Sequence, residues 1–140
     1  MMRPVMTALA ALLLAAGAAQ AADATLYEDL GGADAVERIA HGAIDRSVAD
    51  PRIGHTFENS NVDRVKRLLT EQICDLTGGP CEYSGQTMEA SHKGLALDTA
   101  DFNALVENLQ DAMDEEGVGF RTQNRLLAIL APMHRDVVTE

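Results

Sequence analysis

Apolar residues recur at intervals of three and four through most of the chain, a period that places them along one face of an α-helix. Four stretches show it, at residues 35–48, 62–76, 102–113 and 126–137. Their apolar positions are Ala35, Val36, Ile39, Ala40, Ala43, Ile44 and Val48, then Val62, Val65, Leu68, Leu69, Ile73 and Leu76, then Phe102, Leu105, Val106, Leu109 and Met113, and lastly Leu126, Leu127, Ile129, Leu130, Met133 and Val137. No stretch alternates apolar and polar residues as a half-buried strand does. The pattern predicts an all-α protein.

Residues that start or stop helices lie at the ends of these stretches. Pro51 ends the first, because a proline cannot continue a helix. The pair Gly78–Gly79 closes the second. Asp98 or Thr99 is expected to cap the start of the third with its side-chain oxygen. Pro132 predicts a kink in the fourth.

The N-terminal residues have the composition of an export signal. Arg3 supplies a positive charge, residues 8–16 are rich in alanine and leucine, and Ala19-Gln20-Ala21 fits the pattern of a cleavage site. An uncleaved anchor is the alternative, but this apolar run is shorter than the roughly 20 residues of a spanning helix. We expect a signal peptide over residues 1–21, one domain over residues 22–140, and a periplasmic or secreted protein.

The charge balance limits the kinds of partner. The chain has 22 Asp and Glu residues against 11 Lys and Arg. Nucleic acids and anionic lipids are bound through clustered positive charge, so neither is an expected partner. No segment after the signal is apolar enough to cross a membrane.

One histidine, His92, lies in a short glycine-punctuated segment eleven residues after Cys81. An imidazole held in this way can serve as the single axial ligand of a haem iron. A hydrogen-bonded structural histidine is the alternative, and the residues alone leave both open.

The two cysteines, Cys74 and Cys81, favour a disulfide, because the export signal leads to an oxidising compartment. Free thiols are the alternative. The spacing is not C-x-x-C, and no C-x-x-C-H is present, so covalent attachment of a c-type haem is not indicated.

Several short motifs follow one another in an order and spacing typical of one protein family. They are Leu26-Tyr27-Glu28-Asp29-Leu30-Gly31-Gly32, Ala49-Asp50-Pro51-Arg52-Ile53-Gly54 followed by Phe57, Thr77-Gly78-Gly79-Pro80, Tyr83-Ser84-Gly85, Met88 to His92, and Leu127 to Met133. With these motifs, residues 25–138 resemble the group I truncated haemoglobins. The resemblance implies a two-over-two helical sandwich, the truncated globin fold.

On pattern alone, an antiparallel four-helix bundle competes with this fold. Two features favour the globin-like arrangement. The connection between Gly79 and Thr99 is longer than a compact bundle needs, and the first helix is reduced to a few residues before Gly31–Gly32.

The resemblance implies roles for single residues. His92 matches the family's proximal ligand to the iron of a non-covalent haem b, and Phe57 matches the phenylalanine that packs on the porphyrin face. Ordinary core packing of Phe57 is compatible with that role.

The distal side departs from the family's usual pattern. Ile44, Val65 and Leu69 stand where many members carry a tyrosine and glutamines that hydrogen-bond bound oxygen. Gln72 lies on the same helical face and is the one obvious amide within reach of a ligand. A half-exposed surface glutamine is the alternative for Gln72.

The resemblance therefore implies a haem protein that reversibly binds diatomic gases such as oxygen or nitric oxide. Dioxygenation of nitric oxide to nitrate is a further expected activity that requires an unidentified reductase or other reductant. A haem-based redox or sensing partner and a cofactor-free helical interaction protein are the alternatives. The sequence indicates no oligomeric state.

Overall fold

The computed structural model describes residues 23–140, so the predicted signal peptide lies outside the described part. These residues are helical and contain no strand. The elements, in chain order, are α1 (Leu26–Asp29), α2 (Gly32–Ala49), the 3-10 turn η1 (Gly54–Phe57), α3 (Val62–Leu76), α4 (Met88–His92), α5 (Thr99–Glu115), α6 (Phe120–Leu130), the 3-10 turn η2 (Ala131–Met133) and α7 (His134–Val137). None of the helices in this range is long and apolar enough to span a bilayer.

The helix ends confirm the boundaries predicted from the sequence. Asp98 caps α5, where its carboxylate accepts the backbone N–H of Asp101 at 2.8 Å. The carboxylate of Asp101 in turn accepts the backbone N–H of Asp98, which completes a capping box. At Pro132 the fourth predicted helix breaks into α6, η2 and α7. Because a proline ring removes one backbone donor and crowds the preceding turn, the chain tightens into a 3-10 turn there.

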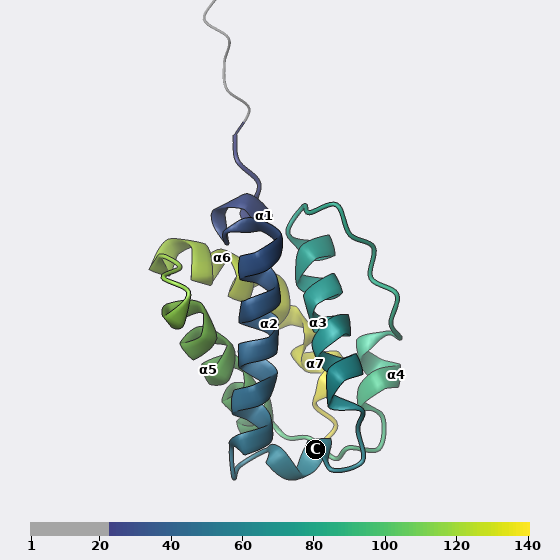
Figure 1. The fold of residues 1–140 in the computed structure, drawn as a ribbon. Helices are drawn as coiled ribbons and strands as arrows, with labels where there is room; N and C mark the ends of the chain where they lie inside the picture. The colour runs from purple at the N-terminus through teal and green to yellow at the C-terminus, as the bar shows by residue number, and fades with distance from the viewer. Residues whose placement is uncertain (1–22) are drawn as a thin grey trace, which may run out of the picture.

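The long helices pack as two antiparallel pairs. In Figure 1 the chain runs down α2 and back up α3, and these two helices lie side by side. It then rises through α5 and returns through α6 and α7 behind them. Small residues make the contact between the pairs, because Ala40 and Ala43 of α2 and Ala112 of α5 are all fully buried. This arrangement is the predicted two-over-two sandwich.

Gly31 allows the short α1 to turn directly into α2. Its φ of +111° is a backbone conformation that residues other than glycine rarely adopt. The backbone N–H of Tyr27 donates to the carbonyl of Thr77 at 2.9 Å, which ties α1 to the end of α3. The reduced first helix is therefore held by the turn and by one backbone bond across the fold.

The core is built where the two pairs cross. Ile39, Ile73, Met113 and Leu126 come from four different helices and are completely buried. Two positions assigned to the apolar stripes by their spacing do not join it. Val48 and Leu76 are 41% and 39% exposed, whereas the residues next to them, Ser47 and Thr77, are buried, so each helix turns the neighbouring residue toward the core instead.

Candidate functional site

His92 is the last residue of α4, a helix of five residues. The hydroxyl of Thr87 caps this helix by accepting the backbone N–H of Ala90 at 3.1 Å. The chain leaves through Gly94 and Ala96, which have φ values of +81° and +53°. Two left-handed residues so close together turn the chain sharply away and leave the half-buried imidazole at the end of the helix.

The hydrogen bonds of His92 define its tautomer. Nδ1 lies 2.8 Å from the carbonyl oxygen of Met88 and 2.9 Å from the hydroxyl of Ser91. Since a carbonyl oxygen only accepts, Nδ1 carries the hydrogen and donates it to Met88. In the neutral ring the other nitrogen, Nε2, then keeps its lone pair, and it has no hydrogen-bond partner among residues 23–140. A backbone carbonyl that holds one ring nitrogen in this way orients the other for a metal.

The residues predicted to form the distal wall come from two neighbouring helices. Ile44 lies on α2 and is 3% exposed, whereas Val65 and Leu69 lie one turn apart on α3 and are half-buried. None of these side chains carries a hydrogen-bond donor. Phe57, at the end of η1, is also half-buried.

Gln72 lies farther along α3, and its amide contacts α4. Nε2 of Gln72 donates to the Met88 sulfur at 3.3 Å. Met88 is also the residue whose carbonyl holds His92. The structure thus places the amide of Gln72 next to the helix that carries the predicted iron ligand.

Several large apolar side chains remain half-buried although the core between the helix pairs is closed. They are Phe57, Val65, Leu68, Leu69, Met88, Phe102, Leu105 and Val106. Apolar side chains in this state gain free energy when a further apolar surface covers them. Together with the oriented imidazole of His92, they fit a flat apolar group that carries a metal.

The other histidines have different surroundings. His134 Nε2 lies 2.9 Å from the hydroxyl of Thr99, and its ring meets the edge of Phe102. His41 lies 3.9 Å from Glu37, and His55 is exposed. No group of three or more His, Cys, Asp or Glu side chains suited to a metal occurs within the described range. His92 is therefore the histidine best placed to bind a metal as a single protein ligand.

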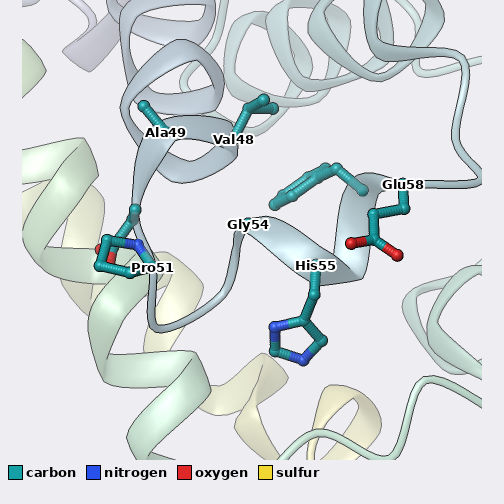
Figure 2. Close-up of a pocket in the computed structure, with 8 residues that line it drawn as sticks. Val48, Ala49, Pro51, Gly54, His55 and Glu58 are labelled. Carbon is teal, nitrogen blue, oxygen red and sulfur yellow. The ribbon is translucent and has the colours of Figure 1, made fainter.

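A hollow of about 400 Å³ lies at the end of α2, and His92 does not line it. Val48 and Ala49 of α2 border it on one side, with Gly54 and His55 of η1 and the following Glu58 on the other (Figure 2). The ring of His55 points away from Val48 and Ala49. Because Phe57 also lines this hollow, the predicted porphyrin-packing residue lies at its edge.

A polar network centred on Asp50, which lines the hollow, joins the end of α2 to α5, and the sequence pattern did not predict it. The carboxylate of Asp50 accepts bonds from the Arg52 guanidinium, at 2.8 Å from Nη2, and from Nδ2 of Asn108 at 3.1 Å. These donors hold the pKa of Asp50 well below its usual range. Asn108 also donates to the buried hydroxyl of Ser47. The available signal was that Asn108 interrupts an apolar i, i+4 row between Ala104 and Ala112.

Cys74 and Cys81 form the predicted disulfide. It joins α3 to the segment that leads to α4, so its position bears on where His92 lies. Lys66, beside the distal Val65, is paired with Asp45 of α2 at 2.6 Å. The side chain of Lys66 is only 18% exposed, so this ion pair also fixes α3 against α2.

Comparisons with known proteins agree on one family. The family model of bacterial-like globins matches residues 25–139. The group 1 truncated haemoglobin of Tetrahymena pyriformis is 32% identical over 114 residues, which cover 81% of this chain and 94% of that protein. The one from Synechocystis sp. is 35% identical over 124 residues, which cover 83% and 98%. The crystal structure of the Tetrahymena pyriformis truncated haemoglobin in its Fe(III) form gives a TM-score of 0.80 at 31% identity, covering 84% of this chain and 100% of that one. The chain therefore belongs to the bacterial-like globins and, among them, to the group 1 truncated haemoglobins.

Proposed function

We propose that this chain binds one non-covalent haem b through Nε2 of His92 and uses it to bind diatomic gases reversibly. The observation that carries the proposal is the bond from His92 Nδ1 to the Met88 carbonyl, which leaves Nε2 as the ligand nitrogen. Phe57 would pack on the porphyrin face, and Ile44, Val65 and Leu69 would form the distal wall. The haem would supply the iron that binds the gas.

Replacing the proposed ligand tests this function directly. We expect purified parent protein to show the absorption bands of haem b, and His92→Ala to lose the haem and unfold at a lower temperature. His55→Ala is the matched control, because His55 is exposed and lies on η1 rather than α4. A ferrous spectrum of His92→Ala identical to that of the parent would refute the ligand assignment, and a parent without haem would refute the function.

The apolar distal wall sets the expected preference among gases. Hydrogen-bond donors beside the haem would favour the retention of oxygen, whereas carbon monoxide would gain much less from them. Ile44, Val65 and Leu69 offer no donor, and the amide of Gln72 is engaged by the Met88 sulfur. A thioether is a weak acceptor, so turning this amide toward the iron costs little.

Gln72→Leu tests the role of this amide. One hydrogen bond to a charged partner is worth about 1.5–3 kcal/mol, which corresponds to a roughly tenfold to hundredfold change in rate. We expect Gln72→Leu to release oxygen faster by that factor in stopped-flow experiments, with carbon monoxide release nearly unchanged. Equal oxygen release from parent and variant would show that Gln72 stays on Met88.

Nitric oxide dioxygenation is a finer proposal for the same site. Ferrous iron, oxygen and nitric oxide give nitrate and ferric iron, so each turnover needs one electron from a reductase or another donor. The apolar distal wall supports entry of these uncharged gases. Rapid mixing of the ferrous protein and oxygen with nitric oxide should yield nitrate and the ferric spectrum, and an unchanged spectrum would exclude this activity.

We also propose that the protein is exported to the periplasm or secreted. The motif at residues 19–21 and the disulfide between Cys74 and Cys81 support this, since disulfides persist in oxidising compartments. N-terminal sequencing of the protein from the exported fraction should begin at Ala22. Recovery of the full chain from the cytoplasm would contradict this proposal.

A further inference from the structure

One face of α3 holds the segment that leads to His92. The Cys74–Cys81 disulfide joins them first. The backbone N–H of Tyr83 then donates to the Asp75 carboxylate at 3.0 Å. Next, Ser84 donates to Glu71 Oε2, from its backbone N–H at 3.2 Å and from its hydroxyl at 2.7 Å. Of the residues of α3 that make these contacts, Glu71 lies three and four positions before Cys74 and Asp75, so all three lie on one side of the helix.

Glu71 is the most fully engaged of these carboxylates. Its Oε2 accepts both bonds from Ser84, and its Oε1 accepts Arg67 Nη1 at 3.0 Å. The hydroxyl of Ser84 and its backbone N–H, together with the Arg67 charge, lower the pKa of Glu71, so the carboxylate stays ionised at neutral pH. Three donors on two oxygens hold the side chain in one orientation. Ser84 is therefore fixed to α3 at a defined height along the helix.

The position of Ser84 along α3 matters because α4 cannot fix its own position. A helix of five residues has too few internal hydrogen bonds to be stable alone. On the C-terminal side of α4, the carbonyl of Leu97 accepts the backbone N–H groups of Thr139 and Glu140 at 3.0 and 3.2 Å. The location of His92 is thus set by the direct contacts of α4 with Gln72 and α7, together with what holds the chain on either side of α4.

The same helix, α3, also carries the distal wall. Val65 lies six residues before Glu71, a separation of about 9 Å along the helix axis. One rigid element therefore bears both the residues expected on the distal side and the anchor of the chain that leads to the proximal side.

We propose that Glu71 is a positioning residue for the proximal histidine, acting through Ser84 to set the height of α4, and hence of His92 Nε2, against α3. This inference rests on the proposed function, because His92 must bind the iron for its position to be read out. Glu71 itself touches neither the proposed haem nor its ligand.

Resonance Raman spectroscopy of the ferrous holoprotein tests the inference, because the iron–histidine stretching band reports how the imidazole is held. We expect Glu71→Ala to broaden and shift this band, and to speed haem loss to an excess of apomyoglobin by about tenfold. Glu71→Gln retains one acceptor oxygen for Ser84 and should restore most of the parent behaviour. Arg67→Ala keeps both Ser84 bonds and removes only the ion pair to Oε1, so it should give a smaller shift of the band than Glu71→Ala.

The outcomes separate this inference from the function on which it rests. If Glu71→Ala shows the parent's stretching band and haem-loss rate, Glu71 does not position His92, and the inference is wrong. A parent that binds no haem would instead overturn the proposed function. Should Glu71→Ala fail to fold, Ser84→Ala removes only the 2.7 Å hydroxyl bond from an exposed residue and should shift the band in the same direction. Hydrogen exchange of the Ser84–His92 amides in the holoprotein should rise in the same variants.

Discussion

Reduction of the Cys74–Cys81 disulfide is expected to lower the free energy of unfolding by about 2.5 kcal/mol at 25 °C. The two cysteines are separated by seven positions, so the closed loop holds eight residues when both ends are counted. In the chain-entropy account, a loop of this length removes about 8 cal/mol/K from the unfolded chain. At 298 K this entropy corresponds to the stated free energy.

The hydrogen bonds that hold this loop in the native state do not depend on the disulfide. Gly79 N–H donates to the Cys74 carbonyl at 2.8 Å, and Tyr83 N–H donates to Asp75, and neither bond involves a sulfur atom. Both bonds remain available after reduction, so the native state loses little. The predicted loss therefore comes from the unfolded state, which regains the freedom of an open chain.

Urea unfolding of the haem-saturated protein, with and without a phosphine reductant, measures this loss. The midpoint should fall by about 1–2 M in urea, and the melting temperature by roughly 8–15 °C. The double variant Cys74→Ala, Cys81→Ala is the control, because its midpoint should not respond to the reductant. A midpoint of the parent that is unchanged on reduction would refute the reasoning, as would uptake of two alkylating labels by protein that had not been reduced.

Three further changes follow from local geometry. Because the pKa of Asp50 is lowered in the folded protein, its ionised form stabilises the fold above the ordinary carboxyl pKa, and the free energy of unfolding should fall as the pH drops below about 4. In Asp50→Asn this fall should be smaller, which unfolding experiments at pH 3 and pH 7 can measure. Ala96→Gly should raise the free energy of unfolding by about 0.5–1 kcal/mol, because alanine is strained at a φ of +53°, whereas Ala96→Val should lower it. Gly79→Ala should cost about 1–3 kcal/mol in denaturant unfolding, since its new methyl group would lie 2.6 Å from Cys74 Sγ and 2.9 Å from the Cys74 carbonyl; unchanged stability would show that α3 can shift there.

Helix positions could be predicted from the sequence because they depend on neighbours along the chain. The side-chain cap of Asp98 and the break at Pro132 each act within one helical turn. The disulfide was also predictable, although from the export signal and the cysteine count rather than from geometry. The family followed from motifs that span nearly the whole domain, and the comparisons confirmed it.

Burial along the apolar stripes was only partly predictable. Spacing placed Val48 and Leu76 in the apolar stripes, but the helices turn Ser47 and Thr77 inward there, and a side chain is buried only where another element packs on it. For the same reason, the network of Asp50 with Asn108 stayed hidden, because its members lie 58 residues apart. A polar side chain in an apolar row shows that a partner is needed, but not which one.

His92 shows most clearly which features the sequence determines and which depend on the tertiary structure. The sequence by itself determined the residue type and its place on a short helix, and the bond from Nδ1 to the Met88 carbonyl is local, since the two residues are four apart. Only the tertiary structure decided where that helix lies, through the contacts of Glu71 and Asp75 with residues 83 and 84. The physical reason is that α4 is too short to be stable alone. Its position is therefore set by contacts with α3 and α7, which the residues of α4 alone do not identify.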